Sequence, residues 1–154
     1  MLVEEAPTAR GPMHDHLPVT CEGGFFTCAS GGLGYGLPAA VGVARGSASR
    51  KVIALLGDGS AMYTIQGLWS AAEQNANVSF LILNNGRYAA LDHFAKVFNM
   101  NQMPGTDIRG LDFVALAGGM GVAAQCVADV ADLDAALEWS LSATGPTLLE
   151  LLVE

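Results

Sequence analysis

Charged residues are scarce in this sequence. They make up 14% of its 154 residues, whereas a typical soluble domain has about 25%. Basic residues are the rarer kind, with 7 Lys and Arg against 15 Asp and Glu, which gives a net charge of −8. Because no basic cluster occurs, nucleic acid is not expected as a partner. The shortage of charge predicts a surface partly covered by another domain or subunit, although a compact Gly- and Ala-rich domain would share this composition.

Cysteine and long apolar runs are also scarce. The three cysteines, Cys21, Cys28 and Cys126, are odd in number and form no CxxC pair, which predicts small buried or half-buried thiols in a reducing cytoplasm. The longest uncharged stretch, 23–44, is interrupted by glycines and Pro38, so no membrane span is expected. The first five residues lack the basic and apolar regions of a signal peptide. We therefore expect a cytoplasmic protein.

Two apolar runs each end in a polar, glycine-containing loop. Residues 52–56 lead into Gly-Asp-Gly-Ser at 57–60, and residues 78–83 lead into Asn-Asn-Gly at 84–86. Open α/β sheets bind ligands at the carboxyl ends of their strands. Asp58 offers a charged oxygen and Asn85 a neutral one, as Mg²⁺ prefers, and the glycines let backbone N–H groups approach a diphosphate. The alternative is two ordinary turns after buried strands.

The rest of the chain alternates between expected strands and expected helices. The strands are expected near 2–3, 25–28, 52–56, 78–83, 122–127 and 147–153, and the helices near 8–17, 37–44, 65–75, 87–98, 111–117 and 132–141. Thr8 is expected to cap the first helix, and Trp69 is expected in the core. This alternation predicts a single α/β domain over 1–154, with three α/β/α layers and a mostly parallel sheet of about six strands.

The glycine-rich loop 31–36, which opens a helix, also suggests a dinucleotide-binding turn. That fingerprint requires glycines at relative positions one, three and six, and no glycine here starts such a series. The acidic residue expected about 20 residues later would fall within 51–58, where Asp58 already fits the first motif. NAD or FAD binding is therefore the weaker reading.

The two polar loops, with 24 residues between Gly59 and Asn84, resemble the signature of thiamine diphosphate (ThDP) enzymes. The resemblance extends along almost the whole chain. It includes 28–40 (CASGGLGYGLPAA), 88–91 (YAAL) with Phe94-Ala95, Pro104-Gly105 and 111–113 (LDF). These segments are similar to the C-terminal, diphosphate-binding domain of the ThDP-dependent 2-oxo acid decarboxylases, and in particular of the benzoylformate decarboxylases. The resemblance implies the ThDP-binding fold.

The resemblance also implies a ligand set for Mg²⁺ and the diphosphate. Asp58, the Asn85 side chain and the Arg87 backbone carbonyl would bind the metal. Gly59 and Ser60 would contact the diphosphate.

Three further cofactor contacts are implied by the same resemblance. Thr8 falls where the family places a hydroxyl on the diphosphate, whereas the family's other hydroxyl falls at Pro7 and is lost. The Gly31 carbonyl would accept a hydrogen bond from the aminopyrimidine, and Leu33 would hold the cofactor bent.

The activity implied is non-oxidative decarboxylation of an aromatic 2-oxo acid such as benzoylformate, with Leu91 and Phe94 lining the substrate pocket. The family's catalytic glutamate comes from a pyrimidine-binding domain of another subunit. No residue here matches it, since Glu4 and Glu5 fall on the first strand. We therefore expect no catalytic residue, no activity alone, and a fragment or subunit of a larger homo-oligomeric enzyme. An acetolactate synthase-like or oxalyl-CoA decarboxylase-like enzyme and a non-catalytic binding module remain alternatives.

Overall fold

The computed structural model describes residues 1–47, 50–100 and 103–154. Six strands form one sheet in the order β2-β1-β3-β4-β6-β5, and every neighbouring pair is parallel. The strands are β1 (Leu2–Glu5), β2 (Phe25–Thr27), β3 (Val52–Gly57), β4 (Val78–Asn84), β5 (Ala123–Val127) and β6 (Thr147–Leu152). The predicted fold class is confirmed, and the sheet is parallel throughout.

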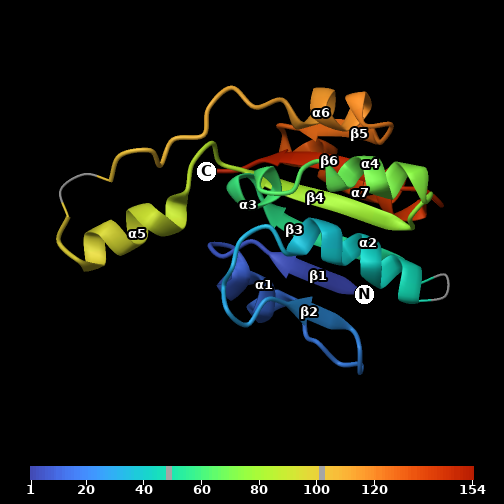
Figure 1. Cartoon of the computed structure of the whole chain (residues 1–154), viewed down its shortest axis with the longest axis horizontal. Helices are drawn as coiled ribbons and strands as arrows, with labels where there is room; N and C mark the ends of the chain where they lie inside the picture. Colours follow the sequence, from blue (N-terminus) through green and yellow to red (C-terminus); the bar gives the residue numbers. More distant parts are fainter. Residues whose placement is uncertain (48–49, 101–102) are drawn as a thin grey trace.

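Helices connect the strands as crossovers, as a parallel sheet requires. They are α1 (Arg10–His16), α2 (Gly36–Gly46), α3 (Asp58–Met62), α4 (Gly67–Glu73), α5 (Ala89–Val97), α6 (Phe113–Gly119) and α7 (Leu133–Ser142), with a 3₁₀ turn, η1 (Val130–Asp132). Most of them cover the sheet, but α5 stands off to one side (Figure 1). No helix in the described part of the chain combines the length and hydropathy needed to cross a membrane.

Two apolar cores lie on opposite faces of the sheet. The larger core contains Val52, Ala54 and Leu56 of β3, packed with residues of α2, α4 and α6. The smaller core lies around Leu81 and Leu149 and is covered by α7. Because β3 alternates buried and half-buried positions, its second face, with Ile53 and Leu55, is covered less completely than its first.

Several local expectations were wrong. Thr8 does not cap a helix: α1 begins at Arg10, and its N-cap residue, Ala9, makes no side-chain capping bond. The helix after β3 was expected to begin at residue 65, but α3 begins at Asp58, directly after β3. α4 then covers only part of the predicted helix, and Trp69 on it is 58% exposed rather than buried in the core.

The cysteines were expected to be buried or half-buried, but two of the three are exposed. Cys21 and Cys126 are exposed, and only Cys28 is half-buried. All three thiols are free.

Candidate functional site

A cavity of about 760 Å³ opens beyond the carboxyl ends of the strands. The chain leaves β1 toward β2 on one side, whereas it leaves β3 toward β4 on the other, and β1 and β3 are neighbours in the sheet. Such a reversal of strand order opens a crevice at the sheet edge, where α/β proteins bind ligands. Most of the lining residues lie at the carboxyl ends of β1, β3 and β4 or just after them, within 6–10, 57–60 and 85–91.

All ten residues singled out from the sequence line this one cavity. They come from four separate segments of the chain and are Thr8, Gly31, Leu33, Asp58, Gly59, Ser60, Asn85, Arg87, Leu91 and Phe94. The structure therefore brings the set together. The individual role given to each residue stays a prediction.

Asp58 joins the two polar loops. Its side chain is 4% exposed. Oδ1 accepts a hydrogen bond from the Gly59 N–H at 2.7 Å, and Oδ2 accepts one from the Gly86 N–H at 2.8 Å. Each carboxylate oxygen has a second lone pair, so Asp58 keeps acceptor capacity for a cation after both bonds are made. Gly86 adopts φ +68°, a backbone conformation that favours glycine.

The other predicted metal ligands also retain free acceptor capacity. The Asn85 Oδ1 atom accepts one hydrogen bond, from the Arg87 N–H at 3.2 Å. The Arg87 carbonyl accepts one from the Ala89 N–H at 3.0 Å. With Asp58, these atoms offer one charged and two neutral oxygens on the cavity wall. A small hard cation that completes its shell with phosphate oxygens and water suits such a donor set.

Tyr88 explains why position 59 is glycine. A methyl group at Gly59 would overlap the Tyr88 ring and come within 2.9 Å of Ile108 Cδ1. The Tyr88 N–H donates to the Thr106 carbonyl at 2.7 Å, which fixes the loop beside the cavity. The pKa of the Tyr88 phenol is raised, first by burial and then by the neighbouring Tyr63 and Asp58. The ring therefore lies against bare backbone at Gly59.

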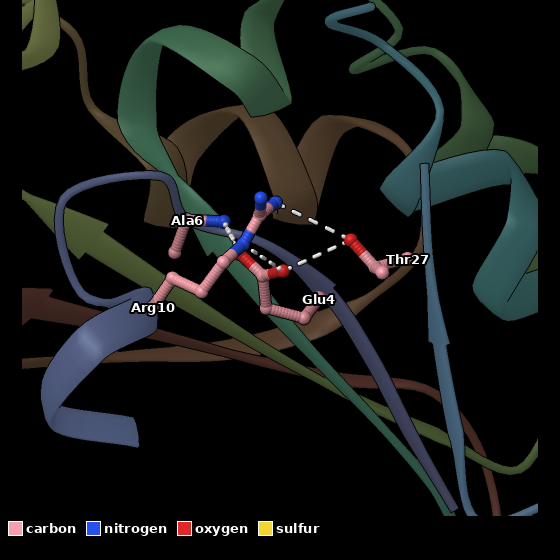
Figure 2. Close-up of polar contacts among 4 residues, drawn as sticks. All are labelled: Glu4, Ala6, Arg10 and Thr27. Atoms are coloured by element: carbon pink, nitrogen blue, oxygen red, sulfur yellow. Dashed lines mark hydrogen bonds and ion pairs between the residues drawn. The ribbon is translucent and has the colours of Figure 1, made fainter. Parts of the chain in front are cut away.

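A buried carboxylate anchors the turn that follows β1. Figure 2 shows Glu4, which is 0% exposed, between the backbone of Ala6 and the side chains of Arg10 and Thr27. Oε1 accepts from the Ala6 N–H at 2.7 Å, and Oε2 accepts from Arg10 Nε at 2.9 Å and from Thr27 Oγ1 at 3.0 Å. Arg10 Nη2 also donates to Thr27 Oγ1 at 3.3 Å. These bonds tie the turn that carries Thr8 to the ends of β1 and β2.

Glu5 does the same for the glycine-rich loop. Its carboxylate is 4% exposed and accepts from the N–H groups of Tyr35 at 3.2 Å and Gly36 at 2.7 Å. A methyl group at Gly36 would come within 2.8 Å of Glu5 Cβ and 2.7 Å of Leu56 Cδ2. This close contact fixes the end of the loop that carries Gly31 and Leu33 to the cavity.

Sequence reasoning missed the supporting roles of Glu4 and Glu5 and placed them simply on a strand. A signal was present, because two adjacent acids ended a strand expected to be covered on both faces. Charges at such positions are rarely buried without partners. Arg10, Tyr63 and Tyr88 also line the cavity. Their sequence positions carry no periodic or spacing signal that would have assigned them to it.

Three of the side chains that line the cavity are large and apolar. Leu33 is 37% exposed, Leu91 39% and Phe94 53%. The site therefore combines backbone and oxygen groups suited to an anion and a cation with apolar surface suited to an organic ring or chain.

A protein-family model matches residues 9–151 of the chain and is described as "Thiamine pyrophosphate enzyme, C-terminal TPP binding domain". Benzoylformate decarboxylase of Pseudomonas aeruginosa is 48% identical over 129 residues, which cover 84% of this chain and 24% of that protein. The mitochondrial acetolactate synthase catalytic subunit of Saccharomyces cerevisiae is 37% identical over 128 residues, covering 81% of this chain and 19% of its own length.

Solved structures are similar as well. The ThDP-dependent 4-hydroxybenzoylformate decarboxylase of Rhodococcus jostii RHA1 superposes with a TM-score of 0.97 at 44% identity, covering 100% of this chain and 29% of that one. Benzoylformate decarboxylase from Polynucleobacter necessarius gives 0.96 at 35% identity, covering 99% and 30%. The chain thus spans about a quarter to a third of the decarboxylases it matches.

Proposed function

The chain belongs to the family of C-terminal TPP-binding domains of thiamine pyrophosphate enzymes, and from this premise we propose that its cavity holds the diphosphate end of ThDP with Mg²⁺. The observation that carries the proposal is Asp58, a buried carboxylate bonded to both polar loops, with acceptor capacity left on the cavity wall. Asp58, the Asn85 side chain and the Arg87 carbonyl bind the metal. This ligand set leaves positions for phosphate oxygens.

The remaining cavity residues bind different parts of the cofactor. Gly59 and Ser60 contact the diphosphate, and the Tyr88 ring leaves no room for a side chain at position 59. Thr8, on the turn anchored by Glu4, adds a hydroxyl.

The glycine-rich loop takes the other end of the cofactor. The Gly31 carbonyl accepts from the aminopyrimidine, and Leu33 supports the bent conformation. Both residues line the same cavity as Asp58.

We propose that the whole enzyme decarboxylates an aromatic 2-oxo acid such as benzoylformate. The names of the P. aeruginosa, R. jostii and P. necessarius relatives support this substrate class, and so do the apolar side chains of Leu91 and Phe94 on the cavity wall. When bound, ThDP supplies the electron sink for loss of carbon dioxide, while the protein supplies position and electrostatics. An acetolactate synthase-type reaction is the second candidate, because the more distant yeast relative is an acetolactate synthase subunit.

We also propose that a pyrimidine-binding domain or subunit covers the cavity and brings the catalytic glutamate. The carboxylates of Glu4 and Glu5 are both buried in bonds within the chain, which leaves neither free to serve the cofactor. The exposed apolar residues of α5 and the segment after it suit such a partner, and they are Leu91, Phe94, Val97, Phe98 and Met100. The assembly would be a homo-oligomer.

The test of metal and cofactor binding is calorimetric titration of ThDP with and without Mg²⁺. Asp58→Ala removes the charged ligand, so Mg²⁺-dependent binding should be lost. Asp129→Ala is the matched control, because Asp129 also holds a backbone N–H, that of Ala131 at 2.9 Å, but does not line the cavity. Unchanged Mg²⁺–ThDP affinity in Asp58→Ala would refute the metal assignment.

The test of the activity uses benzoylformate, excess Mg²⁺ and ThDP. Turnover should occur only when a pyrimidine-binding domain is added, because a correctly placed proton-transfer group gives about 10²–10⁴-fold in rate. Steady turnover by the purified chain alone would contradict the missing-glutamate account.

A further inference from the structure

A third glutamate, Glu150, is buried beside Asn84, where β4 ends and the Asn-Asn-Gly loop begins. Glu150 lies on β6, is 5% exposed, and does not line the cavity. No lysine or arginine in the described part of the chain forms an ion pair with it. Its one hydrogen bond to the described residues is accepted by Oε1 from Asn84 Nδ2 at 2.7 Å. A buried carboxylate with a neutral partner is costly, so its presence calls for a specific reason.

The side-chain oxygen of Asn84 gives this reason, because it connects Glu150 to the loop that follows β4. Asn84 Oδ1 accepts from the Gly86 N–H at 3.0 Å, and the same N–H donates to Asp58 Oδ2 at 2.8 Å. A continuous chain of hydrogen bonds therefore runs from Glu150 through Asn84 and Gly86 to the proposed metal ligand. Asn84 ends β4, and its backbone carbonyl accepts from the Val153 N–H at 3.0 Å, so the loop is also held to β6.

The charge of Glu150 decides which way the Asn84 amide faces. An ionised carboxylate only accepts hydrogen bonds. The Asn84 NH₂ group must therefore face Glu150, and its oxygen must face the Gly86 N–H. The reverse orientation would place two acceptors together at Glu150 and two donors together at Gly86.

We propose that Glu150 is a positioning residue for the metal-binding loop. It fixes the Asn84 amide, which fixes the Gly86 N–H that holds Asp58 in place for the cation. This inference rests on the proposed function for its link to Mg²⁺ and ThDP, but its effect on the loop can be measured without either ligand. Residues that orient metal ligands in this way typically change metal affinity by about 10–100-fold when they are removed.

The first experiment compares three variants of the full chain by calorimetric titration with Mg²⁺ and ThDP. Glu150→Leu removes the acceptor, so affinity should fall about 10-fold or more. Glu150→Gln keeps an acceptor for Asn84, so affinity should stay within about threefold of wild type. Thr147→Val is the matched control on the same strand, because it removes buried bonds to Ser140 Oγ at 2.7 Å and Ser79 Oγ at 3.4 Å, remote from the loop. It should lower stability and leave affinity unchanged.

A second pair of variants keeps the test sharp if Glu150→Leu does not fold. Asn84→Asp sets two carboxylates against each other and should weaken binding. Combining it with Glu150→Gln reverses the hydrogen bond: the new amide donates to the new carboxylate, whose second oxygen still accepts from Gly86. The double variant should regain most of the affinity. A residue with only a packing role would give no such rescue.

The ligand-free measurement is hydrogen exchange at the Gly86 amide, followed by NMR. Glu150→Leu should speed exchange at Gly86 beyond the general change that Thr147→Val produces. Wild-type Gly86 exchange and wild-type Mg²⁺–ThDP affinity in folded Glu150→Leu would overturn the positioning role. If the wild-type chain binds no Mg²⁺–ThDP, the proposed function fails, while Gly86 exchange still decides the role of Glu150.

Discussion

The ion pair between Glu4 and Arg10 should be a measurable anchor of the cavity wall. Arg10→Met removes the guanidinium but keeps a side chain of similar length. Glu4 would then retain only the Ala6 N–H and the Thr27 hydroxyl as partners for a carboxylate that is 0% exposed. The change therefore leaves a buried charge without its cation.

The size of the effect follows from the burial of the two partners. Breaking a fully buried ion pair from one side costs about 3–5 kcal/mol. The Arg10 side chain is 41% exposed, so water can replace part of the lost interaction, and about 1–3 kcal/mol is expected. For a chain of this size, 2 kcal/mol corresponds to a fall in Tm of about 4–8 °C. The double variant Glu4→Gln/Arg10→Met buries no charge, so its stability should lie within about 1 kcal/mol of wild type.

The assay is urea unfolding of wild type, both single variants and the double variant. Their free energies of unfolding form a double-mutant cycle. Equal stability of wild type and Arg10→Met would refute the reasoning, because it would mean that Glu4 is satisfied without a cation. A double variant less stable than Arg10→Met would contradict it too.

Two further predictions concern the packing at Gly59 and the reactivity of two cysteine thiols. Gly59→Ala should destabilise the chain by about 1–3 kcal/mol, the usual cost of overpacking, because the methyl group meets the Tyr88 ring and Ile108; unchanged thermal unfolding would contradict this close packing. Cys28 should be alkylated by iodoacetamide at lower pH than Cys126, although Cys126 is the more exposed. The reason is that hydrogen bonds from Ser30 and then Gly32 lower the pKa of Cys28, whereas burial raises that of Cys126. Peptide mass spectrometry across a pH series would measure both midpoints, and equal midpoints would refute the difference.

The sequence predicted the two central strands, β3 and β4, well because each consists mainly of apolar residues. Residues 52–56 and 78–83 end in polar loops, and the structure has β3 and β4 there. Both runs are covered on two faces, so tertiary packing and local preference agree. Helix starts were harder to predict. The start of α3 at Asp58, directly after β3, was not predicted. The crossover from β3 sets this start, and apolar periodicity does not reveal it.

Burial of single side chains was the least predictable feature. Trp69 lies at helical spacing with Leu68 and Ala72, yet it is 58% exposed while Leu68 is 0% exposed. Spacing indicates which residues share a helix face, but α4 is too short for its pattern to fix how that face meets the sheet. The buried glutamates were missed for a related reason, because their partners are backbone N–H groups and side chains brought close only by the fold.

The all-parallel sheet has a consequence for how the chain acquires its site in time. No two neighbouring strands of the described sheet are joined by a hairpin. Each pairing therefore requires the entropy cost of closing a long crossover before its contacts can form. Glu5 pairs with Leu56, and Thr147 pairs with Ser79. Topologies dominated by such distant pairings fold slowly. Thr8, Asp58 and Asn85 can meet only after β1, β3 and β4 have aligned. Recovery of ligand affinity during refolding should therefore follow the slowest sheet-forming phase.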